Sequence, residues 1–416
     1  MTTLLERLLG EATRLTRAGR LHEATAAIQH ALSGRAARRA YADEDIVDAT
    51  IVAEHAATPA AERPMARDQP VLRERVHEPS VHEPSVHEPS VREPRVHEPS
   101  LREPAGPPAA DARRPSKPVV PPGLGSFESH VYRGRTGTRE YKLFVPAGRS
   151  GQTLGLILML HGCTQNPDDF ATGTRMNEVA AARGFLVLYP AQAPRSNRSK
   201  CWNWFHPGDQ RRGTGEPELL ASLTRHIVQT HPVDPARVYV AGLSAGGAMA
   251  DILGREYPDL FAAVGVHSGL PQGAAHDVAS AFAAMRHGPG AGARMGVGPP
   301  VAPTRDGPGT PVIVFHGDAD ETVHPSNGSH VLGATLAGAV DVSTERIAAG
   351  DRRVTRTVHL RPAAEPGEPS LGEHWLIHGA GHAWSGGDPS GSYADARGPD
   401  ASREMVRFFE EHPRRH

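Results

Sequence analysis

Cysteine is scarce in this sequence of 416 residues, which contains only Cys163 and Cys201. Two cysteines exclude a disulfide-dense scaffold and a zinc site with four cysteine ligands, but leave room for a single disulfide. Net charge is also small, because 45 Lys and Arg residues face 47 Asp and Glu residues. The formal charge of −2 excludes a protein built around a basic nucleic-acid-binding surface or a polybasic membrane patch.

Long apolar runs are missing as well. A membrane-spanning helix needs about 20 consecutive apolar residues, whereas the longest dense apolar stretch, residues 154–160, has the length of a buried strand. Residues 1–20 mix acidic and basic side chains and contain no uninterrupted apolar core of the kind found in a secretory signal. From the sequence alone we therefore expect no membrane span and a cytoplasmic location.

The N-terminal region carries a helical pattern. In residues 1–34, leucine and alanine recur with helical spacing, and Gly19 interrupts the pattern. The segment RAGRLHEATAAIQ resembles one tetratricopeptide unit, but a single copy is too little for a solenoid. We interpret residues 1–56 as a helical hairpin region and residues 1–34 as a candidate surface for docking or self-association.

A proline-rich repeat follows the hairpin. From Val76 onward the sequence reads VHEPS three times, then VREPR, VHEPS and LREPA. Each unit has one aliphatic residue and one proline, so it cannot bury enough apolar surface to offset its chain entropy or form a regular helix. We predict a disordered linker over residues 57–122. Its histidines could chelate a metal weakly, but a plain spacer is the favoured interpretation.

Residues 123–416 alternate between two patterns and form the third predicted region. Short apolar, β-rich segments lie at residues 141–146, 156–160, 185–190, 238–242, 262–269, 311–317 and 373–379. Helical spacing appears at residues 170–183, 218–229, 245–257, 329–337 and 402–411. This alternation predicts an α/β domain with a mostly parallel sheet that is covered by helices on both faces. The Gly- and Pro-rich residues 287–310 predict an insertion loop.

One short motif points to chemistry. Gly242-Leu243-Ser244-Ala245-Gly246 follows an apolar strand and begins a helical stretch. This strand–turn–helix context is typical of a nucleophile elbow, in which a tight glycine-lined turn exposes a serine hydroxyl above a helix N-terminus. A phosphate-binding loop and a simple turn are the alternatives, and the context favours a nucleophilic Ser244.

A serine hydroxyl needs a neighbouring base, and in this arrangement the acid and the histidine follow the serine along the chain. The loop after residues 311–317 offers Asp318, Asp320 and Glu321. The loop after residues 373–379 offers His382, and His378 ends the strand itself. Because a general base must extend beyond the strand, His382 is the better candidate.

Two backbone amides are expected to stabilise an oxyanion at such a serine. One belongs to the residue after the nucleophile, Ala245, and the other to the loop after the third strand. That loop has the sequence LHGCTQN, which makes the amide of Cys163 the candidate for the second donor.

Several motifs together resemble one known family. LHGCTQNPDDF, CWNWF, GLSAGGAM, HGDADETV and GAGHAWSGG, at these intervals, are similar to the esterase family named for poly(3-hydroxybutyrate) depolymerase. The family includes short-chain polyhydroxyalkanoate depolymerases and is related to feruloyl and acetylxylan esterases. The resemblance covers about residues 130–410 and implies an α/β-hydrolase fold.

The resemblance also implies roles for particular residues. Its pattern H-G-x-x-D-x-x-V selects Asp320 as the acid, beside Ser244 as nucleophile and His382 as base. It implies a disulfide between Cys163 and Cys201, to which two buried thiols are the alternative. Three tryptophans near the predicted site are candidates for lining an acyl groove or for core packing: Trp202, Trp204 and Trp384.

The implied activity is that of a serine esterase. It would hydrolyse the ester bonds of poly- or oligo(3-hydroxybutyrate) or of related short-chain polyhydroxyalkanoates through an acyl-enzyme, without metal or organic cofactor. A feruloyl or acetylxylan esterase with the same residues is the first alternative, and a non-enzymatic scaffold that contacts polymer granules through residues 1–34 is the second. A metal site at the acidic loop is disfavoured, because the triad needs one of its carboxylates. Family members are commonly secreted, in contrast to the cytoplasmic location expected above.

Overall fold

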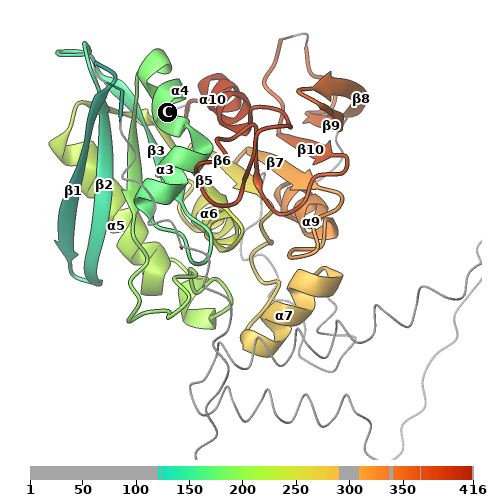
Figure 1. Ribbon diagram of the computed structural model, residues 1–416, viewed down its shortest axis with the longest axis horizontal. Helices are drawn as coiled ribbons and strands as arrows, with labels where there is room; N and C mark the ends of the chain where they lie inside the picture. Colours follow the sequence, from blue (N-terminus) through green and yellow to red (C-terminus); the bar gives the residue numbers. More distant parts are fainter. Residues whose placement is uncertain (1–119, 122, 290–308, 337–340, 366, 415–416) are drawn as a thin grey trace, which may run out of the picture. The chain divides into compact units, whose positions relative to one another are not determined.

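The computed structural model of the chain describes residues 120–121, 123–289, 309–336, 341–365 and 367–414 (Figure 1). The predicted hairpin, nearly all of the predicted linker and most of the predicted insertion loop lie outside the described residues. Among the described helices, none is both long enough and apolar enough to cross a membrane.

Ten of the described strands form one sheet with the order β1-β2-β4-β3-β5-β6-β7-β10-β9-β8 (Figure 1). The strands from β4 to β10 in this order run parallel, and the two outermost strands at either edge are antiparallel to their neighbours. The bounds are β1 Gly125–Gly134, β2 Gly137–Pro146, β3 Leu154–Leu160, β4 Phe185–Pro190, β5 Val233–Leu243, β6 Ala263–His267, β7 Val312–Gly317, β8 Asp341–Ala349, β9 Arg352–Leu360 and β10 Gly372–Ile377. Two short strands, β11 (Trp384–Ser385) and β12 (Ala394–Asp395), pair separately.

Helices cover both faces of the sheet (Figure 1). The helices on one face are α5 (Gly215–Thr230), α6 (Ala245–Glu256), α7 (Val278–His287) and α9 (Ser326–Thr335). Those on the other face are α3 (Pro167–Thr174), α4 (Met176–Arg183) and α10 (Ala401–Glu411). A short 3₁₀ turn, η1, spans Pro207–Asp209.

The central strands separate two hydrophobic cores, because neighbouring side chains of a strand point to opposite faces. In β3, Leu156 and Leu158 belong to the core that includes residues of α5 and α6, whereas Ile157 and Met159 belong to the core that includes residues of α3 and α10. All seven residues of β3 are buried, as expected for a parallel strand between two helical layers. The predicted α/β-hydrolase fold is thereby confirmed.

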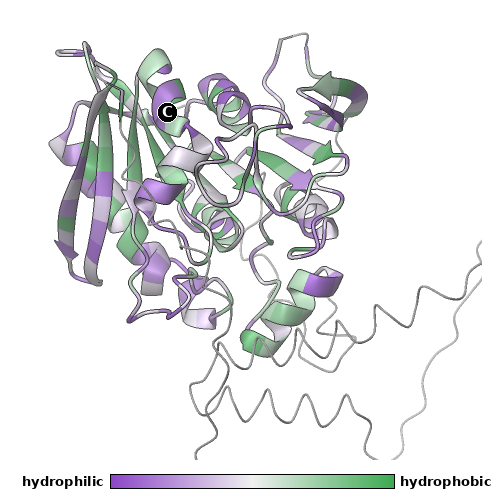
Figure 2. Ribbon diagram, in the orientation of Figure 1, coloured by the Kyte–Doolittle hydropathy of each residue, from purple (hydrophilic) through white to green (hydrophobic). Residues whose placement is uncertain are grey.

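The elements that the sequence did not predict lie mostly at the edges. β1, β8 and β9 carry many polar or exposed residues, so they lack the apolar pattern of the central strands (Figure 2). Helix α7 was not predicted either. The single helix expected at residues 170–183 is divided into α3 and α4 at Arg175, whose φ of 55° is left-handed.

The beginning of α6 lies against the end of β3 with almost no space between the two backbones. A Cβ atom added to Gly246 would lie 2.0 Å from the carbonyl oxygen of Leu160, and one added to Gly242 would lie 2.3 Å from the carbonyl carbon of Gly246. Only glycine fits at either position. This approach places Ser244, in the turn between them, beside Gly162: a Cβ atom added there would lie 3.6 Å from the Ser244 Cβ.

We therefore expect Gly246→Ala to lower the free energy of unfolding by at least about 1–3 kcal/mol, the usual cost of overpacking. Gly333→Ala is the matched control, since Gly333 lies in α9 and a Cβ there meets nothing within 4 Å. Alanine in a helix should raise the free energy of unfolding by about 0.5–1 kcal/mol. Urea unfolding followed by circular dichroism measures both; an unchanged Gly246→Ala protein would contradict the packing argument.

Candidate active site

Ser244 occupies the turn between β5 and α6 in a strained backbone conformation. Its φ of 58° and ψ of −120° lie in a region that a residue with a side chain rarely adopts. Its amide donates a hydrogen bond of 2.9 Å to the carbonyl oxygen of His267, which ties the turn to β6. Such strain costs about 1–3 kcal/mol and persists where the surroundings enforce it, which is common at functional sites.

Asp320 and His382 lie on the loops after β7 and β10 and contact each other. The Nδ1 atom of His382 is 2.7 Å from Oδ2 of Asp320, and the other carboxylate oxygen accepts hydrogen bonds from the amides of Thr322 and Val323 at 2.9 and 2.8 Å. Burial by itself would raise the pKa of Asp320, but hydrogen bonds from His316, His382 and the Val323 amide outweigh it and hold this pKa well below its usual range. The carboxylate is thus ionised and fixed in place.

His316, at the end of β7, is a further partner of this carboxylate. Its Nε2 atom lies 2.8 Å from the carbonyl oxygen of Val323 and 3.4 Å from Oδ2 of Asp320. Because both neighbours are acceptors, Nε2 must carry the proton. The sequence signal for this contact is the four-residue spacing between His316 and Asp320 in the pattern H-G-x-x-D.

The other carboxylate and histidine considered from the sequence also pair. Nδ1 of His378 is 2.7 Å from Oδ2 of Asp318, and Nε2 of His378 is 2.9 Å from the hydroxyl of Thr355. This second pair is far more exposed, at 34% and 37% of the side chains against 10% for His382 and 0% for Asp320. It links the same two loops at the surface.

His267, at the end of β6, was not considered from the sequence, and its place after an apolar strand is the only signal for it. The ring is fully buried, stacks against Trp384 at a centroid distance of 5.3 Å, and accepts a hydrogen bond of 3.0 Å from the amide of Ser385 at Nε2. Burial, and secondarily the neighbouring His316 and His382, lower its pKa to about 3. A neutral His267 therefore anchors the segment that follows His382.

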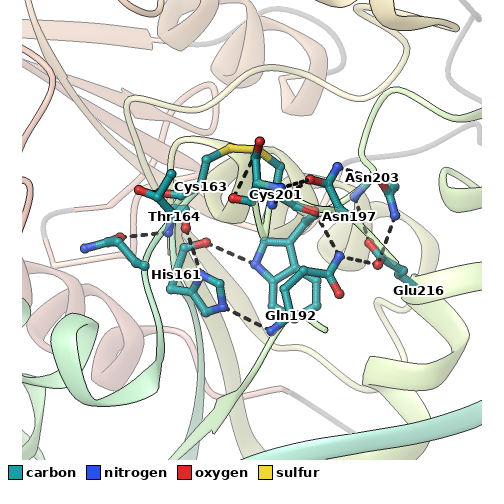
Figure 3. Close-up of a disulfide and its surroundings, with 12 residues drawn as sticks. His161, Cys163, Thr164, Gln192, Asn197, Cys201, Asn203 and Glu216 are labelled. Atoms are coloured by element: carbon teal, nitrogen blue, oxygen red, sulfur yellow. Dashed lines mark hydrogen bonds between the residues drawn. A yellow bond between two sulfur atoms is a disulfide. The ribbon is translucent and has the colours of Figure 1, made fainter. Parts of the chain in front are cut away.

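The loop after β3 is held by several hydrogen bonds and by a disulfide (Figure 3). Cys163 and Cys201 are bonded, as the family resemblance implied. The amide of Gly162 donates to Oε1 of Gln165 at 2.9 Å, and the amide of Thr164 donates to the carbonyl oxygen of Ser199 at 2.7 Å. Among the described residues the amide of Cys163, between them, has no acceptor, as an oxyanion donor requires.

The three tryptophans named from the sequence are buried. Trp202 and Trp384 are 0% and 1% exposed, and Trp204 is 5% exposed. The Nε1 atom of Trp202 donates to the carbonyl oxygen of His161 at 3.0 Å, and that of Trp384 donates to the hydroxyl of Ser402 at 3.1 Å. Trp202 thus holds the start of the loop after β3, and Trp384 ties the segment after His382 to α10.

The acidic loop was also considered as a metal site. In the part of the chain that the structure describes, no group of three or more His, Cys, Asp or Glu side chains has an arrangement that could hold a metal ion. The carboxylates of the loop instead bind histidines, as Asp318 and Asp320 do.

The buried His267 predicts a pH dependence of stability. In the folded state it stays neutral down to about pH 3, whereas in the unfolded chain it takes up a proton below about pH 6.5. The stability contributed by the neutral, buried ring is thus fully present above about pH 6.5 and is lost as the pH falls from there towards about 3. Between about pH 6 and 4.5, His267→Gln should reduce the slope of unfolding free energy against pH by about 1.4 kcal/mol per unit. Ser268→Ala, which removes no titrating group, should keep the wild-type slope in urea titrations.

The disulfide predicts a loss of stability when it is absent. It closes a loop between residues 38 apart, for which cross-linking typically contributes about 2–4 kcal/mol. The double variant Cys163→Ala, Cys201→Ala should unfold at correspondingly lower urea concentration. Dithiothreitol should destabilise the wild type and leave the double variant unchanged; equal responses would argue against a stabilising cross-link.

Comparison with known proteins finds matches to esterases and to a polyester depolymerase. The family model described as esterase PHB depolymerase matches residues 139–357. Poly(3-hydroxyalkanoate) depolymerase C of Paucimonas lemoignei is 36% identical over 193 residues, which cover 45% of this chain and 45% of that protein. The probable acetylxylan esterase A of Aspergillus fumigatus is 27% identical over 200 residues, covering 46% and 53%. Feruloyl esterase B of Neurospora crassa is 32% identical over 127 residues, covering 30% and 42%.

The chain thus spans about half the length of the curated relatives it matches. Among solved structures, the acetyl xylan esterase from Aspergillus awamori aligns with a TM-score of 0.48 at 18% identity, over 69% of this chain and 100% of that one. Since the family model covers more than half of the 416 residues, the chain belongs to the esterase PHB depolymerase family.

Proposed function

We propose that the chain is a serine carboxylesterase in which Ser244 is the nucleophile, His382 the general base and Asp320 the acid. The observation that carries the proposal is the buried contact of 2.7 Å between His382 and Asp320, on the loops after β7 and β10. The strained turn at Ser244 supports it, because this turn begins a helix beside the loop after β3, residues 161–166, which we call the oxyanion loop.

The proposed reaction follows from the tautomer of His382. With the Nδ1 proton directed to Asp320, Nε2 is free to accept the proton of the Ser244 hydroxyl while the oxygen attacks the ester carbonyl carbon. The amides of Ala245 and Cys163 would stabilise the resulting oxyanion. The carbon–oxygen bond to the alcohol then breaks, His382 returns the proton to the departing oxygen, and water releases the acid from Ser244 by the same steps.

Asp320 has two functions in this scheme. It holds the imidazole ring in the tautomer that leaves Nε2 unprotonated, and its negative charge stabilises the imidazolium form of His382 during each proton transfer. The lowered pKa of Asp320 supports both, because the carboxylate stays ionised throughout the neutral pH range.

We propose poly- or oligo(3-hydroxybutyrate) and related short-chain polyesters as substrates. The 36% identity with a poly(3-hydroxyalkanoate) depolymerase supports this class. Feruloyl or acetyl groups on polysaccharide are the second candidate, supported by the relatives of those names. A scaffold that binds polymer through residues 1–34 without hydrolysis is the third.

The two Asp–His pairs provide a matched test of the mechanism. Ser244→Ala should abolish hydrolysis of p-nitrophenyl butyrate, and Asp320→Asn should lower kcat by about 10³–10⁴, since it favours the wrong tautomer of the base. Asp318→Asn, the same change in the exposed pair, should have a far smaller effect. Equal losses in the two Asn variants, or an active Ser244→Ala protein with native circular dichroism, would overturn the assignment.

The substrate class is tested by comparing three substrates at equal concentration. The substrates are the trimer of 3-hydroxybutyrate, methyl ferulate and acetylated xylan. Release of 3-hydroxybutyrate from the trimer by the wild type, and not by Ser244→Ala, supports a polyester substrate. Turnover only of methyl ferulate or acetylated xylan moves the function to polysaccharide esters. No turnover of any ester by a folded wild type would favour the scaffold.

A further inference from the structure

One exposed aromatic side chain lies directly beside the proposed base. Among the described residues, the large apolar side chains that are exposed are Val131, Phe282, Val342 and Tyr393, the last at 46%. The ring of Tyr393 meets the imidazole of His382 edge to face, with 6.3 Å between the centroids. Because nearly half of Tyr393 is exposed, its ring is accessible to a molecule bound beside His382.

The backbone of Tyr393 is held in an unfavourable conformation. Its φ is 53°, in the left-handed region, which an aromatic residue rarely adopts. Its carbonyl oxygen accepts a hydrogen bond of 2.7 Å from the amide of Trp384, next to the pairing of β11 with β12. The strain is therefore maintained by contacts that fix the direction in which the side chain leaves the backbone.

The residue before it is fixed as well. The amide of Ser392 donates to Oδ1 of Asp169 at 2.8 Å, and its carbonyl oxygen accepts from Nε2 of Gln165 at 2.9 Å. Gln165 is the side chain that also accepts from Gly162 in the oxyanion loop. The backbone beside Tyr393 and the oxyanion loop are thus joined through the buried side-chain amide of Gln165. The distance between these two segments is therefore fixed before a substrate binds.

The position beside His382 determines which half of an ester the ring can meet. In the proposed reaction His382 gives its proton to the departing alcohol oxygen, so the alcohol half must lie next to the imidazole. The acyl carbonyl oxygen points instead to the amides of the oxyanion loop and Ala245. We propose that Tyr393 forms the wall against which the alcohol half of the ester binds and that it sets the preference for the size of this half; the inference rests on the proposed esterase function.

The test compares two series of esters. The first varies the alcohol, from methyl to butyl and hexyl butyrate, and the second varies the acid, from methyl acetate to methyl butyrate and methyl hexanoate. Tyr393→Asn removes the ring and keeps a residue type that tolerates positive φ, so the fold should be retained. The ratio of kcat/KM for hexyl over methyl butyrate should fall about tenfold, mainly through KM, because apolar contacts of this size are worth about that much. The ratio across the acid series should be kept.

Two further variants complete the design. Tyr393→Phe should keep the alcohol ratio within about twofold, because it retains the ring that makes the contact. Tyr132→Ala is the matched control: this ring also lies beside a histidine, at 5.4 Å from His226, but on the edge strand β1. It should leave both ratios unchanged.

The outcomes separate this inference from the proposed function. An active Tyr393→Asn enzyme with an unchanged alcohol ratio, or with a changed acid ratio instead, would overturn the role of Tyr393 and leave the esterase assignment intact. A wild type without turnover on any ester, or turnover that survives Ser244→Ala, would overturn the proposed function and this inference with it.

Discussion

The close approach of two backbones at Gly246 is the constraint on which the arrangement of the site depends. The first turn of α6 can touch the carbonyl oxygen of Leu160 only because residue 246 has no side chain. This contact determines where Ser244 lies relative to the loop that begins at His161, and hence how far the serine is from the amide of Cys163. The hydrogen bonds and the disulfide of that loop then hold it in the position beside Ser244 that the missing side chain of Gly246 allows.

The second organising feature is the carboxylate of Asp320. It is removed from solvent but accepts from two backbone amides and lies beside two imidazole rings, so its charge is balanced by donors on β7, its own loop and the loop after β10. Because these elements come from different parts of the sequence, the carboxylate also fixes the loops relative to each other. His267 completes this support from β6 by binding the segment after His382.

The sequence predicted those parts of the molecule whose physical signal is local. Apolar strands such as residues 185–190 and the turn at Ser244 have patterns that few other structures share. The edge strands β1 and β8 were missed because one-sided or exposed strands carry mixed side chains, and their pairing is decided by distant residues. His267 and Tyr393 were missed for a related reason: a single histidine or tyrosine has no distinctive spacing, and its importance arises only when the chain brings it against His382 or Trp384.

The amide side chain of Gln165 bridges the loop after β3 and the backbone before Tyr393. Substitutions on either side of this bridge therefore share a partner, and their energetic effects should not simply add. Under the proposed mechanism, affinity for the alcohol half of an ester and stabilisation of the transition state would therefore be thermodynamically coupled. Selection for a different alcohol at Tyr393 would then be accompanied by changes in turnover. A new specificity in this fold would be expected to evolve through paired substitutions rather than single ones.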